Sequence, residues 1–424
     1  MRKKVIIALI LGIGVFAVAS LAISGIEKNK KDDLYRQVQL FSDAFAIIQS
    51  EYVNEMSPKD MVYGALKGML SALDPHSQFM DPDTYNELKV DTEGKFGGIG
   101  VEITVKDGLL TVVTPIEDTP AWKAGIKAND RIVKINNELT REMTITDAVK
   151  KMRGKPAEPV NITILRESEK KILEFKIIRD IIKIKDIKEA RILEDGIGYI
   201  RLVEFRENTP QDINAALENL SKAGMNALIL DLRNNPGGLL EVAVKVTERF
   251  IEKDKLVVST KGRKPSQDFK FISHSDHPIL NLPMVVLINE GSASGSEIVA
   301  GCLQDYRRAL ILGVKSFGKG SVQTVIPLSD GSALRLTTSK YFTPLGKVIH
   351  EKGVMPDIVV EAGKIEIAGA EETKAEKPQD IFEEIENKEK PGKEEKPWDY
   401  KSDNQLMRAV DVLKAAKFYK GQNQ

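Results

Sequence analysis

The chain reads Asn289-Glu290-Gly291-Ser292-Ala293-Ser294-Gly295-Ser296-Glu297 directly after a hydrophobic run, Met284 to Ile288. The run predicts a buried strand, and a helical pattern continues from Glu297 to Leu303. Ser294 therefore lies at a strand-to-helix junction, where free backbone N–H groups and the positive end of the helix dipole would stabilise a developing oxyanion. These features make Ser294 a candidate nucleophile, which needs a base to remove its proton.

Few side chains in the sequence could serve as that base. A Ser-His-Asp arrangement has few ways to form, because the 424 residues include only four histidines: His76, His274, His277 and His350. Lys319 is an alternative, in the segment Ser316-Phe317-Gly318-Lys319-Gly320-Ser321. A lysine on a glycine-rich turn is more often a solvated charge than a base, so its spacing alone leaves both interpretations open.

Three segments in combination change that balance. They are Asn289 to Ser294, Ser296 to Gly301, and Phe317-Gly318-Lys319-Gly320-Ser321-Val322-Gln323. Together they resemble the C-terminal processing (tail-specific) peptidases of the S41 type, which are serine proteases with a Ser-Lys dyad. The resemblance implies that Ser294 is the nucleophile and Lys319 the general base.

A lysine base must be neutral to accept the serine proton, although the ordinary pKa of lysine is about 10.4. Burial would lower that pKa, and the glycines flanking Lys319 allow the backbone to pack closely. The resemblance also implies a third polar residue that orients the lysine, and both Gln323 and Glu297 match that role. We favour Gln323, since an ionised Glu297 beside Lys319 would raise the lysine pKa. Glu297 remains the alternative, and a first-turn carboxylate facing the helix dipole explains it equally well.

A second segment predicts the oxyanion hole. Ala227 to Asp231 reads as a buried strand, and Leu232-Arg233-Asn234-Asn235-Pro236-Gly237-Gly238 reads as a tight turn before another helical pattern. This block resembles the Asp-Leu-Arg-x-Asn-Pro-Gly-Gly segment of the same peptidases. Gly237 and Gly238 would let backbone N–H groups approach the scissile carbonyl, and the N–H of Gly295 would be the other donor.

Other motif interpretations of these segments are weaker. Gly313 to Lys319 matches Gly-x-x-x-x-Gly-Lys, but Gly320 follows where a phosphate loop needs Ser or Thr. Ser316-x-x-Lys319 matches a penicillin-binding pattern, yet its companion motifs are missing. His274 and His277 have metal-like spacing on a polar stretch without further ligands, so a surface loop is the better interpretation. We therefore expect no metal site and no cofactor.

A further module is indicated by Phe96-Gly97-Gly98-Ile99-Gly100, which resembles the carboxylate-binding loop of PDZ domains. Thr119 to Ile126 and Asn129 to Asn136 resemble the rest of such a domain. The resemblance implies that Gly97, Gly98, Ile99 and Gly100 capture the terminal carboxylate of a peptide, whose backbone adds to a strand edge. Arg153, at the far edge of this module, carries a permanent charge, and we expect it to link tail binding to assembly of the active site.

The N-terminus suggests a location. Arg2-Lys3-Lys4 precedes Val5 to Ile26, an uncharged stretch long enough to cross a bilayer, with the basic flank inside. This pattern predicts a single-pass membrane anchor with an extracytoplasmic (periplasmic) catalytic part. A cleaved secretory signal ending near Ala17-Val18-Ala19 is the alternative. The single cysteine, Cys302, fits export without disulfides and reads as a buried packing residue.

The expected fold class is multidomain α/β: an N-terminal helical segment, a PDZ domain and a ClpP/crotonase-like α/β catalytic core. The 62 basic and 62 acidic residues balance, so charge gives no argument for nucleic acid as a partner. The expected divisions are 1–26, anchor or signal; 33–90, helical region; 91–180, PDZ domain; 181–362, peptidase core; 363–400, charged linker; and 401–424, C-terminal helix.

The sequence thus predicts a serine endopeptidase that selects proteins with apolar C-terminal tails and uses Ser294 and Lys319. A noncatalytic PDZ adaptor or holdase for exported C-termini is the alternative, and the complete serine, lysine and glycine set argues against it. The expected partners are substrate proteins and the membrane, with a homo-oligomer and a regulatory adaptor as further possibilities.

Overall fold

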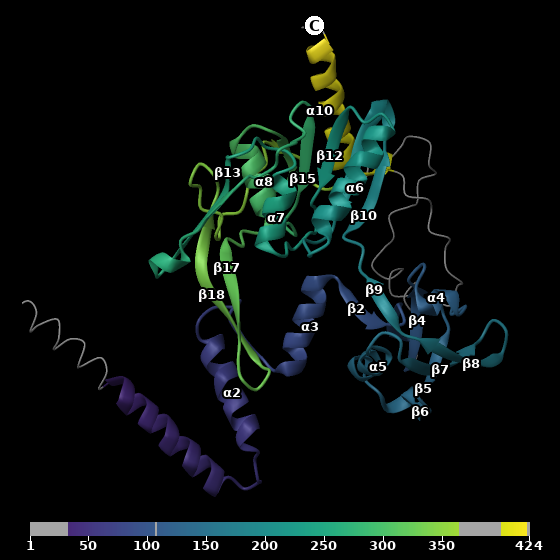
Figure 1. Ribbon diagram of the computed structural model, residues 1–424, viewed down its shortest axis with the longest axis vertical. Helices are drawn as coiled ribbons and strands as arrows, with labels where there is room; N and C mark the ends of the chain where they lie inside the picture. The colour runs from purple at the N-terminus through teal and green to yellow at the C-terminus, as the bar shows by residue number, and fades with distance from the viewer. Residues whose placement is uncertain (1–32, 107, 364–399, 422–424) are drawn as a thin grey trace, which may run out of the picture. The chain divides into compact units, whose positions relative to one another are not determined.

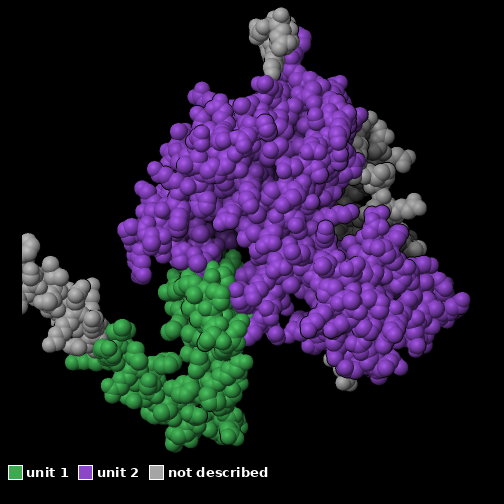
Figure 2. All heavy atoms as spheres, viewed as in Figure 1, with its two compact units in different colours: residues 1–81, 325–336 green, residues 82–324, 337–424 purple. Residues whose placement is uncertain are grey.

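The computed structural model describes residues 33–106, 108–363 and 400–421 (Figure 1). The chain divides into two compact units (Figure 2). One comprises the N-terminal residues up to Asp81 together with Val325–Leu336, and the other comprises Pro82–Thr324 and Thr337–Gln424.

The first unit is built from helices and one short strand. Residues 33–51 are helical, and α2 (Pro58–Ser71) follows, with proline in the first turn, where its missing N–H leaves no bond unmade. Strand β1 (Gln78–Met80) pairs antiparallel with Ala333–Arg335. The hydroxyl of Tyr63 donates a 2.8 Å hydrogen bond to Asp330. These contacts hold the tip of a hairpin whose two strands continue into the second unit.

The second unit begins with a helix and a small β domain. The sheet has the order β3-β4-β5-β7-β8, so β3 is an end strand, and β6 pairs with β5. Burial alternates along β7, where Val160, Ile162 and Ile164 are fully buried, as expected for a strand with one face on a core. Strands β2 and β9 form a separate pair. The elements are α3 (Pro82–Glu93), β2 (Lys95–Gly98), β3 (Val101–Lys106), β4 (Leu109–Pro115), α4 (Pro120–Lys123), β5 (Arg131–Ile135), β6 (Glu138–Leu139), the 3₁₀ turn η1 (Thr140–Glu142), α5 (Ile145–Met152), β7 (Pro159–Arg166), β8 (Lys171–Ile178) and β9 (Asp180–Lys183).

The rest of the unit is an α/β core around a mostly parallel sheet. Its elements are β10 (Ile187–Ile192), η2 (Glu194–Gly196), β11 (Ile197–Leu202), α6 (Thr209–Lys222), β12 (Ala227–Asp231), α7 (Leu240–Thr247), β15 (Met284–Ile288), α8 (Gly295–Asp305), β16 (Leu310–Gly313), β19 (Ile358–Val359), η4 (Tyr400–Ser402) and α10 (Asn404–Gly421). The strand order is β10-β11-β12-β15-β16-β19, and only β10 runs antiparallel to its neighbour in this described sheet.

Both faces of this sheet are covered, which explains why every residue of β12 and β15 is buried. On one face, Leu228, Leu230 and Val286 pack in a cluster with apolar residues of α6, α7 and α8. On the other face, Ile229 and Val285 pack with residues of α10, the yellow helix of Figure 1. The C-terminal helix is therefore a layer of the core.

A second sheet carries the hairpin that follows Lys319. Strand β13 pairs antiparallel with β14 and with the C-terminal half of β18, and β17 pairs with β18. The elements are β13 (Leu256–Gly262), η3 (Pro265–Gln267), β14 (Lys270–Ile272), β17 (Ser321–Pro327) and β18 (Ala333–Phe342).

The predicted membrane location is contradicted and must be corrected. Within residues 33–106, 108–363 and 400–421, no helix is both long enough and apolar enough to cross a membrane. The stretch from Val5 to Ile26, on which that prediction rested, lies outside the described residues, as does most of the predicted linker, 364–399. The location assigned from the sequence is accordingly withdrawn.

Candidate active site

Ser294 lies directly before α8, at the end of the loop that leaves β15. Its backbone has φ 52° and ψ −111°, a conformation that a residue with a Cβ rarely adopts. Such strained positions cost about 1–3 kcal/mol and cluster at active sites. The side chain is half-buried, at the N-terminus of the helix. The sequence predicted the junction but gave no sign of the strain.

The carboxylate of Glu297 connects this turn to the loop that carries Lys319. It is fully buried. It accepts hydrogen bonds from the N–H of Ser294 at 2.9 Å, the hydroxyl of Ser316 at 2.6 Å, the N–H of Gly318 at 2.7 Å and the N–H of Lys319 at 2.9 Å. Burial raises the pKa of Glu297, although all four donors act to lower it. Glu297 thus holds two loops together. Its bonds to Ser316, Gly318 and Lys319 are more than the helix-dipole interaction of a first-turn carboxylate.

The Lys319 loop packs tightly against the rest of the core. A Cβ on Gly320 would lie 2.2 Å from the backbone nitrogen of His350, so this position requires glycine. The N–H of Glu351 donates to the Gly318 carbonyl at 2.8 Å, and that of Tyr341 donates to the Gly320 carbonyl at 3.0 Å. Lys319 itself is half-buried. Close packing around the two glycines is what the sequence led us to expect.

Tyr341 is a residue of this site that the sequence did not indicate. It lies on β18 and is only 1% exposed. Its hydroxyl donates to the carbonyl of Lys319 and also contacts the Ser294 side chain. Burial, reinforced by the charge of Glu297, raises the pKa of Tyr341 well above its ordinary value. The residue therefore stays a neutral hydrogen-bond donor between the two loops.

Gln323, the favoured third residue, lies on β17 and is half-buried. Its side-chain amide donates to the hydroxyl of Ser321 at 2.9 Å and to that of Thr337 at 3.5 Å. These bonds keep the amide on the strand that begins two residues after Lys319. Glu297, in contrast, bonds directly to the Lys319 backbone.

The two glycines after β12 approach Ser294 closely. Gly237 has φ 104°, and a Cβ there would lie 2.6 Å from the Cβ of Ser294. The N–H of Gly237 donates to Asn235 Oδ1 at 2.9 Å, which differs from the expectation that it faces a substrate. Within the described part of the chain, the N–H groups of Gly238 and Gly295 donate no hydrogen bond. These two groups are the donors available at the site.

The predicted tail-binding segment is only partly a loop, because Gly97 and Gly98 end strand β2 and pair with β9. Its carbonyl groups hold it in place. The Gly97 carbonyl accepts from the N–H of Gly154 at 3.1 Å, that of Ile99 from Ala121 at 2.8 Å, and that of Gly100 from Ile116 at 3.0 Å. A Cβ on Gly97 would lie 2.0 Å from the carbonyl oxygen of Gly154. The side chain of Ile99 is buried in the core of the β domain. The end strand β3 begins directly after this loop, as peptide addition to a strand edge requires.

Arg153 directly follows α5, beside this segment. Its guanidinium lies over the ring of Phe96, 4.5 Å from the centroid, in a cation–π contact. A Cβ on Gly98 would lie 3.8 Å from the Arg153 Cα. The side chain is half-buried, and no carboxylate of the described chain forms an ion pair with it.

Across residues 33–106, 108–363 and 400–421, no group of three or more His, Cys, Asp or Glu side chains could hold a metal ion. Cys302 is buried in α8, and burial raises the pKa of its thiol. A buried neutral thiol is a packing residue and not a nucleophile.

Comparison with known proteins adds independent findings. Residues 196–360 match the model of peptidase family S41, residues 111–166 match a PDZ domain, and residues 17–84 match the N-terminal domain of the activating protease CtpB. The chain is 46% identical over 354 residues to a carboxy-terminal-processing protease of Bartonella bacilliformis, covering 82% of this chain and 81% of that protein. It is 36% identical over 323 residues to the carboxy-terminal processing protease CtpB of Bacillus subtilis, and the match covers 75% of this chain and 66% of that protein. The solved structure of a photosystem II D1 C-terminal processing protease is 29% identical in sequence. The match covers 76% of this chain and 92% of that chain, with a TM-score of 0.44.

These matches confirm the predicted fold class, with its N-terminal helical segment, PDZ domain and α/β peptidase core. They also fit binding of a protein substrate and of an adaptor. Taken with the arrangement of the site, they identify the chain as a member of peptidase family S41, among the carboxy-terminal-processing proteases.

Proposed function

We propose that this protease is a serine-type endopeptidase that uses Ser294 as nucleophile and Lys319 as general base. The observation that carries the proposal is that the N–H groups of both residues donate to one oxygen of Glu297, at 2.9 Å each. That shared acceptor brings the Ser294 turn and the Lys319 loop together, and Tyr341 reaches both from β18. Covalent catalysis requires a nucleophile and a base on adjoining segments.

The reaction follows from these positions. The neutral amine of Lys319 takes the proton from Ser294 Oγ as the oxygen attacks the scissile carbonyl carbon. The carbonyl oxygen gains the negative charge and accepts hydrogen bonds from the N–H groups of Gly238 and Gly295. The lysine ammonium then gives its proton to the leaving amine, and the C–N bond breaks to leave an ester on Ser294. Water attacks the ester after giving a proton to Lys319, and that proton returns to Ser294 as the product acid leaves.

Substrate selection is proposed to occur at the PDZ domain. The segment Gly97-Gly98-Ile99-Gly100 would bind the terminal carboxylate of a substrate through backbone N–H groups, while the tail extends along β3, an end strand of the described sheet. Aliphatic residues along β3 and at the start of α5, including the partly exposed Val105 and Ile145, favour apolar tails. Arg153, adjoining that loop, is proposed to signal an occupied site to the catalytic core.

The test compares the parent protein with the Ser294→Ala variant on an unfolded protein that ends in an apolar tail. The same substrate with an amidated C-terminus serves as the control for tail capture. We expect fragments from the parent only, and at least tenfold slower cleavage of the amidated substrate, since a neutral amide loses the charge-assisted bonds of the carboxylate. Cleavage by Ser294→Ala at the parent's rate would overturn the nucleophile assignment, and equal rates on both substrates would overturn tail capture.

A further inference from the structure

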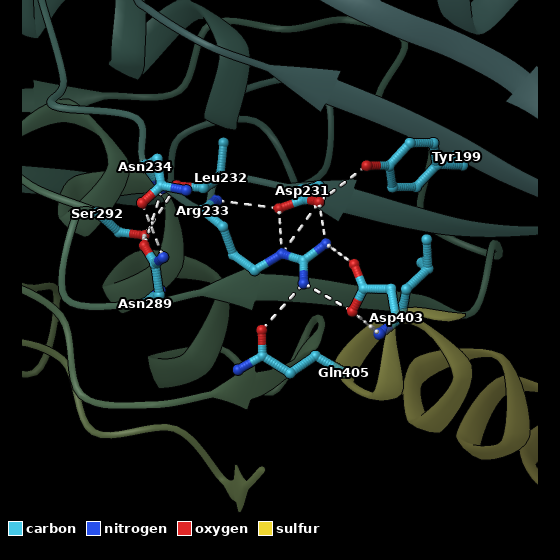
Figure 3. Close-up of polar contacts among 10 residues, drawn as sticks. Tyr199, Asp231, Leu232, Arg233, Asn234, Asn289, Ser292, Asp403 and Gln405 are labelled. Carbon is cyan, nitrogen blue, oxygen red and sulfur yellow. Dashed lines mark hydrogen bonds and ion pairs between the residues drawn. The ribbon is translucent and has the colours of Figure 1, made fainter. Parts of the chain in front are cut away.

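Arg233 links the C-terminal helix to the loop that carries Gly237 and Gly238 (Figure 3). Its Nε and Nη2 donate to the carboxylate of Asp231, at 2.9 and 2.6 Å. Its Nη1 and Nη2 donate to the carboxylate of Asp403, at 3.0 and 2.7 Å, and Nη1 also donates to Gln405 Oε1 at 2.9 Å. All N–H groups of the guanidinium are therefore used.

This cluster is shielded from solvent. Side-chain exposure is 0% for Asp231, 13% for Arg233 and 27% for Asp403. Burial acts to lower the pKa of Arg233, but its bonds to the two carboxylates outweigh that effect and hold the pKa above its ordinary value. Burial likewise acts to raise the pKa of Asp403, and the bond from Arg233 reverses the direction. Each partner in such a network is costly to remove, because the remaining charge stays buried.

The residues around Arg233 are bonded to the nucleophile loop. The N–H of Asn234 donates to Asn289 Oδ1 at 2.8 Å, and Asn289 Nδ2 donates back to Asn234 Oδ1 at 2.9 Å. The hydroxyl of Ser292 donates to the Leu232 carbonyl at 2.8 Å. Beyond Asn234, which has φ 56°, the Asn235 carbonyl accepts from the N–H of Ala293 at 3.0 Å. Displacement of Arg233 would therefore shift the glycine loop relative to Ser294.

The start of α10 includes the residues that bond to Arg233. Asp403 precedes the helix and caps it, with Oδ1 accepting from the N–H of Leu406 at 3.1 Å. Gln405 is 2% exposed and donates to the Val360 carbonyl at 2.7 Å, which ties the helix to the chain after β19. Four apolar residues of α10 are at most 1% exposed against the sheet: Leu406, Ala409, Val410 and Leu413.

We infer that Asp403 is a positioning residue of the reaction: through Arg233 it sets where the glycine loop stands relative to Ser294. The turn that begins α10, and not the rest of the helix, then supports the catalytic groups, although Asp403 lies 170 residues after Arg233 in the chain. This inference rests on the proposed function, because it assigns a role in holding the oxyanion donors of that reaction.

The experiment compares Asp403→Asn with Lys414→Met in the full chain. Lys414 is the control, since it forms an ion pair from the later part of α10, with Glu194 at 2.8 Å, on a contact separate from Arg233. We expect Asp403→Asn to lower kcat about tenfold with KM changed less than twofold, because a small misplacement of catalytic groups acts on the transition state. Inhibition by a peptide aldehyde, whose adduct places an oxyanion at the site, should weaken by the same factor. Lys414→Met should keep the parent's kcat and aldehyde affinity.

Thermal unfolding of both variants and a second substitution, Gln405→Met, separate positioning from loss of folding. Gln405→Met should also lower kcat, but by a smaller factor than Asp403→Asn. The inference would be overturned if Asp403→Asn and Lys414→Met had equal kcat. It would also be overturned if Asp403→Asn lowered the unfolding temperature and left kcat unchanged. The Ser294→Ala variant distinguishes the two claims. If it hydrolyses substrate as fast as the parent, the proposed function fails. If it is inactive, and Asp403→Asn has the same kcat as Lys414→Met, only the inference about Asp403 fails.

Discussion

Ser294 and Lys319 donate their backbone N–H groups to the same atom, Oε2 of Glu297, each at 2.9 Å. The two residues lie on separate loops, and the buried carboxylate fixes the distance between those loops. Because Glu297 is occupied by backbone and hydroxyl donors, it acts as a support for the loop that carries the lysine. The site therefore depends on the geometry of one acidic side chain at the start of α8.

Replacing Glu297 with Gln should loosen this arrangement. The amide offers an NH₂ group in place of one acceptor oxygen, so at least one of the donors from Ser294, Ser316, Gly318 and Lys319 loses its partner. We expect kcat to fall by about 10- to 100-fold and the free energy of unfolding at neutral pH to fall by about 1–3 kcal/mol. Steady-state kinetics and urea unfolding measure the two effects, and an unchanged kcat would show that the shared acceptor has no part in catalysis.

The raised pKa of Glu297 also predicts a pH dependence. As pH rises above about 4.3, the unfolded chain ionises this carboxyl before the native protein does. Its contribution to stability is therefore present below that pH and is lost as pH rises through the higher pKa of the folded state. The unfolding temperature of the parent, measured relative to Glu297→Gln, should increase as pH is lowered from 7 towards 4. A difference that decreases on acidification would show that the pKa shift has the opposite sign.

Gly237→Ala tests the close approach of the glycine loop to Ser294. The added Cβ would lie 2.6 Å from the Ser294 Cβ, at a position with φ 104°. We expect kcat to fall at least about 100-fold, which is the loss expected when an oxyanion site is displaced. Gly224→Ala is the matched control, since Gly224 also has a positive φ, 84°, but has no atom within 4 Å of its added Cβ. If the two variants lose activity equally, backbone strain rather than approach to Ser294 explains the requirement for glycine.

Arg153→Ala tests the coupling of tail binding to hydrolysis. The substitution removes the guanidinium that lies over Phe96 beside the glycine loop. We expect the acceleration of hydrolysis by an apolar tail to fall about tenfold, while a tail peptide binds the variant with less than threefold change, because no loop N–H group is removed. Arg153→Lys keeps the charge but loses the planar contact with the ring, and it should give an intermediate result. Tail-dependent hydrolysis equal to the parent's in Arg153→Ala would remove the role assigned to this residue.

The parts of the fold that sequence could predict are those with local patterns. The fully apolar runs of β12 and β15 predicted buried strands, and both are buried along their whole length. The glycines around Lys319 predicted close packing, which the approach of Gly320 to His350 displays. The helical pattern after Glu297 likewise predicted α8.

Other features depend on contacts between distant segments, which no local pattern contains. The four donors on Glu297 come from two loops about 20 residues apart in sequence, and Tyr341 reaches Ser294 only because β18 returns past the site. The bond from Arg233 to Asp403 spans 170 residues. Gly237 was expected to be a donor to the substrate, but its N–H bonds to the side chain of Asn235, two residues earlier; this local turn of an Asn before Pro-Gly was missed in the sequence. The membrane location failed for a different reason, since it rested on hydropathy outside the described residues.

The most direct test of the Ser294 and Lys319 assignment is the site and rate of covalent labelling by a fluorophosphonate. The parent, Ser294→Ala and Lys319→Ala would be treated at neutral pH and followed by intact-mass spectrometry, with peptide mapping of the adduct. The account predicts one adduct on the parent, located at Ser294, none on Ser294→Ala, and labelling at least about 100-fold slower for Lys319→Ala, because its serine has lost its base. An adduct at another residue, or labelling of Lys319→Ala at the parent's rate, would contradict it.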